Sequence, residues 1–113
     1  MRIVITLSLL LSLAAAAFAD TPETVLVTFR PKAGAEAELE RVIGKHWETV
    51  TRLHLVTNDN RMIYRVRDED GKTHFVQILT WKDAEIPDHA PAEVLRWWKE
   101  MQRLGTIDFV EIT

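Results

Sequence analysis

One stretch limits the folds open to this chain more than any other, the segment Thr73–Trp81, Thr-His-Phe-Val-Gln-Ile-Leu-Thr-Trp. Successive side chains of a strand point to opposite faces, and a strand with one wet face alternates apolar with polar residues. Here both faces are bulky, with Val76 and Ile78 on one side and Phe75 and Leu79 on the other. The segment therefore predicts a strand that is covered on both faces, and the covers must come from the rest of the chain or from a partner.

The N-terminus predicts a removable export signal over residues 1–19. Arg2 gives a positive start, residues 3–17 are almost entirely apolar, and residues 17–19, Ala-Phe-Ala, have the small-x-small pattern of a cleavage site. The apolar run is shorter than the roughly 20 residues that a bilayer span needs, which favours secretion over an uncleaved anchor. We therefore expect a secreted or periplasmic protein with no membrane contact after cleavage, and a single domain over residues 20–113.

Composition narrows the function classes. The chain has no cysteine, which excludes disulfides, thiol chemistry and thiolate metal sites. The net charge is −3, with acids and bases interspersed and no basic run, so we expect no nucleic-acid partner. A domain of this size buries only roughly 60 to 65% of its unfolded surface, so pairing with a second copy would add useful burial.

Hydrophobic periodicity predicts an α+β chain of the order β-α-β-β-α-β. Stretches of alternating apolar residues indicate strands, and stretches with apolar residues every three or four positions indicate helices. The expected strands are 24–30, 62–67, 73–81 and 107–112, and the expected helices are 35–55 and 91–104. This order is typical of the ferredoxin-like fold, a four-stranded antiparallel sheet with both helices on one face.

The dipeptide Asp70-Gly71 between the second and third strands predicts a two-residue type I′ hairpin turn. Such a turn fixes the register of the two strands, so that Arg67 faces His74 and Tyr64 faces Gln77. The side chains that would then face the helices are those of Met62, Tyr64, Val66, Phe75, Leu79 and Trp81.

The helix-free face of the expected sheet is half apolar. In the inferred register, Arg65, Arg67 and His74 lie there among apolar residues. The apolar residues are Ile63, Val76 and Ile78. A monomer should present a polar face here, so we expect a homodimer that forms through it. The basic side chains could bind an anion, but a solvated or interfacial salt-bridge patch is the simpler interpretation.

With this order assembled, the chain resembles the dimeric α+β barrel superfamily, in particular the antibiotic-biosynthesis-monooxygenase-like domains. The resemblance covers nearly all of residues 20–113. It rests on the Pro-x-x-Gly-x-x turn at 31–36, on His46-Trp47, on the Asp70-Gly71 hairpin, on the strand and following residues at 75–83, and on the His89 loop before a helix with tryptophan and methionine. In that family two sheets close face to face across a twofold axis, and a ligand cleft lies between the helices and the sheet of each monomer.

The resemblance leaves the activity open, because members include cofactor-free oxygenases, haem-degrading enzymes, isomerases and decarboxylases. The haem-degrading branch needs an asparagine on the first strand, and residues 24–30 contain none. This departure argues against haem degradation.

The candidate site is a group of aromatic and histidine side chains on the helix-facing side. An oxygenase without a cofactor needs an apolar pocket and a base that forms the reactive anion, and histidine can be that base near neutral pH. The candidate catalytic residues are His46 and His89, and the candidate ligand-binding residues are Trp47, Tyr64, Trp81 and Trp98. The alternative is that the tryptophans simply fill a small core and that His46 is a satisfied histidine beside them.

No cofactor and no metal is expected. No two of the four histidines have the His-x-x-x-His spacing, and the chain lacks a nucleophile elbow, a phosphate loop and a dinucleotide fingerprint. Two functions stay open. The first is an exported protein that binds a small apolar or aromatic molecule between helices and sheet. The second is a cofactor-independent monooxygenase that acts on an aromatic or quinol-type substrate.

Overall fold

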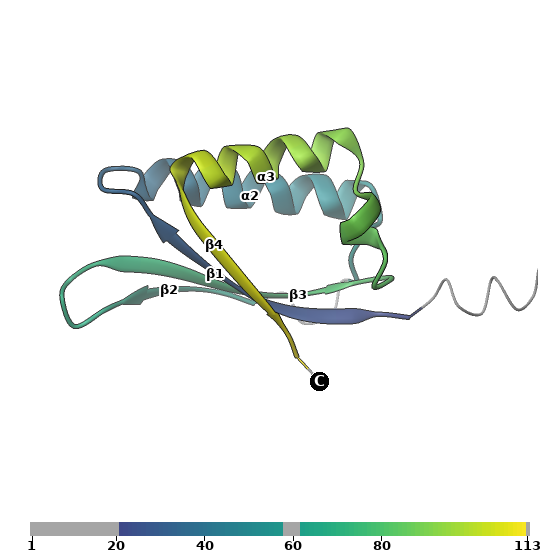
Figure 1. Cartoon of the computed structure of the whole chain (residues 1–113), viewed down its shortest axis with the longest axis horizontal. Helices are drawn as coiled ribbons and strands as arrows, with labels where there is room; N and C mark the ends of the chain where they lie inside the picture. Colours follow the sequence, from purple (N-terminus) through teal and green to yellow (C-terminus); the bar gives the residue numbers. More distant parts are fainter. Residues whose placement is uncertain (1–20, 58–61, 113) are drawn as a thin grey trace, which may run out of the picture.

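The computed structural model describes residues 21–57 and 62–112, in which four antiparallel strands carry two helices on one face (Figure 1). The strands lie in the order β2-β3-β1-β4. In chain order the elements are β1 (Glu23–Pro31), α2 (Glu36–Arg52), β2 (Met62–Arg67), β3 (Thr73–Trp81), the 3-10 helix η1 (Ile86–His89), α3 (Ala92–Leu104) and β4 (Gly105–Glu111). The predicted ferredoxin-like fold is therefore confirmed, whereas the expected export signal lies outside the described residues.

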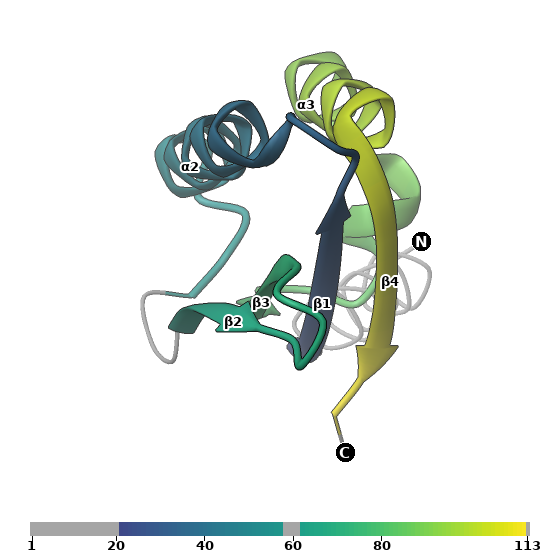
Figure 2. The same ribbon diagram turned by 90° about the vertical axis from the view of Figure 1, so that its left-hand side faces the viewer.

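The two helices cover the sheet side by side, with α2 over its β2 side and α3 over its β4 side (Figure 2). Most of their inward-facing apolar residues are buried against the strands. One buried cluster contains Phe29, Leu39, Val42, Ile43, Phe75, Met101 and Leu104. A second contains Val25, Val50, Val56, Leu79, Trp81 and Val94. The helices are held by these contacts more than by their intrinsic propensity, as is usual for helices of this length.

Helix α3 passes into β4 without a loop. It ends at Leu104, and β4 begins at Gly105, whose backbone lies so close to Arg30 of β1 that any Cβ there would overlap the Arg30 carbonyl. The φ angle of 177° at Gly105 is extended backbone that any residue adopts, so the requirement for glycine is steric. The close approach sets β4 beside β1, with Ile107 opposite Phe29.

The β2–β3 hairpin has a three-residue loop instead of the predicted two-residue turn. The Asp68 N–H donates to the carbonyl of Lys72 at 2.8 Å, and the Gly71 N–H donates to the carbonyl of Asp68 at 2.9 Å. Gly71 has a φ of 85°, which places it in the left-handed region. This is a type I turn completed by a glycine bulge.

The longer loop shifts the predicted register by one residue. Tyr64 pairs with Val76 and Ile63 with Gln77, so every β2 side chain lies on the face opposite to the one predicted. The prediction was wrong for β2 and right for β3, where Phe75, Leu79 and Trp81 face the helices. The core cluster now includes Ile63, and Arg65 on the same face pairs with Glu40 and with Glu36 of α2.

The helix-free face is more apolar than the predicted register implied. Of the three basic residues expected there, only His74 lies on it, with its Nδ1 3.1 Å from the Asp68 carboxylate. The apolar side chains of this face are those of Leu26, Met62, Tyr64, Val66, Val76, Ile78 and Val110. Several are well exposed, including Tyr64 at 47% and Val110 at 60%.

Candidate functional site

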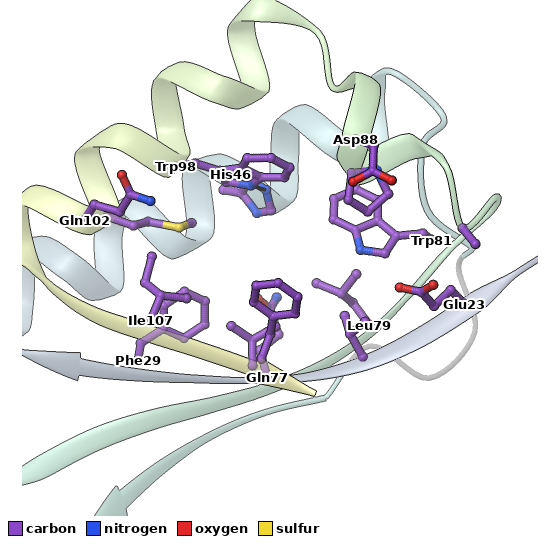
Figure 3. Close-up of a pocket in the computed structure, with 16 residues that line it drawn as sticks. Glu23, Phe29, His46, Gln77, Leu79, Trp81, Asp88, Trp98, Gln102 and Ile107 are labelled. Atoms are coloured by element: carbon purple, nitrogen blue, oxygen red, sulfur yellow. Dashed lines mark hydrogen bonds between the residues drawn. The ribbon is translucent and has the colours of Figure 1, made fainter. Parts of the chain in front are cut away.

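A cavity of about 400 Å³ lies between the sheet and the two helices (Figure 3). Strands β1, β3 and β4 form its floor, α2 and α3 form its roof, and the segment around η1 closes one end. Most of its lining is apolar and includes Val25, Phe29, Leu79, Met101, Ile107 and Phe109. Its volume falls within the range of roughly 300 to 1,000 Å³ that small-molecule sites occupy.

Three of the six predicted site residues meet in this cavity. His46 reaches it from α2, Trp81 from the end of β3 and Trp98 from α3. The three rings form a cluster with centroid separations of 6.3 to 6.4 Å, and Trp81 lies edge-on to both other rings. Edge-to-face packing at this separation is favourable between aromatic rings.

The other three predicted residues do not line the cavity. Trp47 is half-buried on α2 and packs against the second core cluster. Tyr64 lies on the helix-free face as a consequence of the register shift. His89 is exposed at the end of η1, although the neighbouring Asp88 does line the cavity.

The hydrogen bond between His46 and Trp98 fixes the tautomer of the imidazole. Trp98 Nε1–H donates to His46 Nε2 at 2.8 Å, and an indole nitrogen can only donate. The neutral His46 ring therefore carries its proton on Nδ1. That Nδ1 is buried and has no hydrogen-bond partner among the described residues.

Burial also keeps His46 neutral. The side chain is 3% exposed, and desolvation lowers the pKa of His46 from 6.5 to about 4. Its one basic nitrogen already accepts a hydrogen bond from Trp98, so His46 has a buried N–H and no free basic nitrogen. This geometry argues against the general-base role expected for His46.

Gln77 is a site residue that the sequence analysis missed. It lies on β3 between Val27 of β1 and Ile63 of β2, it is 0% exposed, and it lines the cavity. Neither its Oε1 nor its Nε2 has a hydrogen-bond partner among the described residues. The signal was present in the helix-facing row Phe75, Gln77, Leu79 and Trp81, where only the glutamine is polar.

The charged groups around the cavity are acidic. Glu23 and Asp88 line it, and none of the lysines and arginines within 21–57 and 62–112 does. Across the same described ranges, no three histidine or carboxylate side chains lie together as metal ligands would, and no helix has the length and apolar content that crossing a bilayer requires.

Comparison with known proteins gave matches in structure alone. No family model matches the chain, and no curated protein matches it in sequence. A point-mutant form of SnoaB, a cofactor-independent oxygenase from Streptomyces nogalater, superimposes with a TM-score of 0.65 and 24% identity over 84% of this chain and 93% of its own.

Two further structures show the same likeness. A conserved protein of unknown function from Bacteroides thetaiotaomicron has a TM-score of 0.67 and 11% identity over 83% of this chain and 98% of its own. An antibiotic biosynthesis monooxygenase has a TM-score of 0.63 and 17% identity over 80% of this chain and 96% of its own. At these identities the likeness concerns the fold, and at that level it confirms the resemblance drawn from the sequence.

Proposed function

We propose that this chain, which shares its fold with antibiotic-biosynthesis-monooxygenase-like proteins, binds a small apolar or aromatic molecule between its helices and its sheet. The observation that carries the proposal is the cavity of about 400 Å³, whose lining is mainly apolar and includes two tryptophans. A concave and mostly apolar pocket of this size is the usual form of a small-molecule site. The tryptophans therefore serve both the core and the wall of a binding site.

The aromatic cluster gives the site a preference for flat ligands. Trp81 and Trp98 meet at an interplanar angle of 81°, so they present differently oriented ring surfaces to the cavity. An aromatic ligand can stack on one ring and lie edge-on to the other, and each such pair contributes about 0.5 to 1.5 kcal/mol beyond burial.

The proposal is tested by filling the cavity. Val27 lines its floor beside Gln77, so Val27→Phe should occupy the space where a bicyclic aromatic such as naphthalene would lie. We expect naphthalene to raise the thermal unfolding temperature of the wild type and to lose that effect in Val27→Phe, because a ligand stabilises only the state that binds it. The control is Leu95→Phe, at a position that is 49% exposed. If no apolar aromatic compound stabilises the wild type, the proposal fails.

A cofactor-independent monooxygenase acting on an aromatic or quinol-type substrate is the second candidate. It is supported by His46, which lines the cavity and carries its proton on Nδ1, and by the fold shared with SnoaB. His89, the last residue of η1, lies outside the cavity lining and is the remaining one of the two candidate bases. Oxygen uptake with a quinol tests this activity. Uptake that is unchanged in the double variant His46→Ala, His89→Ala would remove both residues from the mechanism.

We also propose that the chain forms a homodimer through the helix-free face. The support is the apolar surface there, with Leu26 paired to Ile78 and to Val110 at the centre of the sheet. Tyr64 and Met62 extend this surface to the β2 edge and are 47% and 44% exposed. Exposed apolar patches of this kind mark interaction surfaces.

Export is the last part of the proposal. Its support is the pattern of residues 1–19, which predicts a cleaved signal and a secreted or periplasmic location. N-terminal sequencing of the protein recovered from its native compartment tests it. We expect the mature chain to begin at Asp20, and a retained Met1 would contradict export by cleavage.

A further inference from the structure

The amide of Gln77 is the most unusual polar group of the described core. It is 0% exposed, it sits in the middle of β3, and both of its polar atoms lack a protein partner within the described ranges. Burying a polar group without a hydrogen bond destabilises a fold by about 1 to 3 kcal/mol, so native proteins rarely leave one in place. Such a local violation is expected where function requires the group.

We propose that Gln77 is the polar anchor of the cavity and that it selects a neutral aromatic ligand with a hydrogen-bond donor and an acceptor on the same edge. A side-chain amide presents a carbonyl oxygen and an NH₂ side by side. A cyclic amide presents the complementary N–H and C=O in the same arrangement and can form two hydrogen bonds with it. The inference rests on the proposed binding function and names the chemical class of the ligand.

The surroundings of Gln77 favour a neutral ligand. A carboxylate would meet Glu23 and Asp88, and no lysine or arginine of the described ranges lines the cavity to balance it. A cation could pair with Glu23 or Asp88, but it would offer no acceptor to the Gln77 NH₂ or to the His46 Nδ1–H. Figure 3 shows Gln77 on the sheet side of the cavity and His46 and Trp98 on the helix side. Gln77 and the pair of His46 and Trp98 therefore lie on opposite sides of the cavity.

Three bicyclic probes of similar shape separate the contribution of the polar edge from that of the ligand charge. Carbostyril is an aromatic cyclic amide, naphthalene lacks the polar edge, and naphthoate carries a carboxylate. We expect the wild type to bind carbostyril roughly tenfold or more tighter than naphthalene, since two hydrogen bonds to a buried amide supply at least that much discrimination. Naphthoate should bind more weakly than either. The measurement is titration calorimetry on the mature chain.

The decisive variant is Gln77→Met, which keeps the length of the side chain and removes both hydrogen-bonding atoms. We expect the preference for carbostyril over naphthalene to fall to about one, while the thermal unfolding temperature of the empty protein stays the same or rises. The matched control is Lys99→Met, because Lys99 is exposed on α3 and does not line the cavity. It should keep the wild-type preference. Gln77→Asn, with a shortened amide, should lose part of it.

The outcomes separate this inference from the function on which it rests. If the wild type binds carbostyril and naphthalene equally, Gln77 is not an anchor, but the apolar binding site stands. If no probe binds, the proposed binding function itself fails. If Gln77→Met keeps the preference for carbostyril over naphthalene, the Gln77 amide is not its cause and the inference is overturned.

Discussion

The two faces of the sheet are both largely apolar, but they differ in how far their side chains are exposed and in the polar groups that they bury. On the helix-covered face, Phe75, Gln77 and Leu79 are at most 2% exposed, and this face holds the cavity and an amide without a partner among the described residues. On the other face, Tyr64 and Val110 are 47% and 60% exposed. A buried polar group that lacks a partner indicates a site for a small ligand, whereas an exposed apolar surface indicates a contact with another protein surface. This difference is the basis of the two separate binding proposals for one sheet.

The largest expected effect tests the helix-free face. Ile78 lies at its centre, opposite Leu26 and Met62, so Ile78→Lys would place a charge in the proposed dimer interface. We expect a homodimer of the wild type at micromolar concentration and a roughly hundredfold weaker association in the variant, because burying an unpaired charge opposes association. Light scattering during size exclusion measures both.

The control for this prediction is Leu95→Lys, on the outer surface of α3, which should remain dimeric. A wild type that is monomeric at micromolar concentration would break the comparison, because the second face would then have no partner of its own kind.

The next effect concerns pH and tests how tightly the helix-covered face is closed. The pKa of His46 is lowered by burial to about 4, whereas the unfolded chain titrates near 6.5. Between these values the unfolded chain binds more protons, so the free energy of unfolding should fall by about 3 kcal/mol as the pH drops from 6.5 to 4. Above pH 6.5 this contribution is constant.

The control variant is His46→Gln, which retains an acceptor for the Trp98 indole but does not titrate. Denaturant unfolding at a series of pH values should show a smaller loss in this variant than in the wild type. Equal losses in both proteins would mean that His46 is accessible to protons and that the face is more open than the structure shows.

A smaller effect on stability tests the hydrogen bond between Trp98 and His46 in the cavity wall. Trp98→Phe removes the donor to His46 Nε2 and leaves that nitrogen buried without a partner, which should lower the free energy of unfolding by about 2 kcal/mol. Nitrogen NMR should report the Nδ1–H tautomer in the wild type and a mixed population in the variant. The control Trp97→Phe removes a bond to Thr49 at 2.9 Å and should leave the tautomer unchanged.

The smallest effect concerns the turn that decides which β2 residues lie on which face. Gly71→Ala places a side chain at a φ of 85°, and we expect a loss of about 1 kcal/mol in the free energy of unfolding. The matched control is Gly44→Ala within α2, where a new Cβ meets nothing within 4 Å. Alanine should stabilise the helix there by up to about 1 kcal/mol. Equal effects at both positions would contradict the left-handed turn.

Much of the fold could be predicted from the sequence, because it depends on periodicity. The two faces of β3 followed from alternating bulk, and the helices followed from their apolar stripes. The register of β2 could not be predicted, since Asp70-Gly71 fits both a two-residue turn and a three-residue loop with a left-handed glycine. The choice depends on the bond that Asp68 makes with Lys72, and that one-residue difference moved Tyr64 out of the predicted site.

The candidate site was only partly predictable. The inward-facing apolar stripes identified Trp81 and Trp98, which line the cavity. The state of His46 depends on the approach of Trp98 from another helix, 52 positions along the chain, which no local pattern encodes. Gln77 was visible as the polar member of an apolar row, but whether such a residue finds a partner is decided only by the packed structure.

Gly105 links the packing at the junction of α3 and β4 to the shape of the cavity. Because a side chain there would push β4 away from β1, it would also displace Ile107 and Phe109, which form part of the cavity lining. Gly105 itself lines no part of that cavity. In a random mutagenesis screen scored by ligand affinity, we therefore expect substitutions at Gly105 as well as in the cavity lining. The Gly105 substitutions would act by moving β4 and not by direct contact with the ligand.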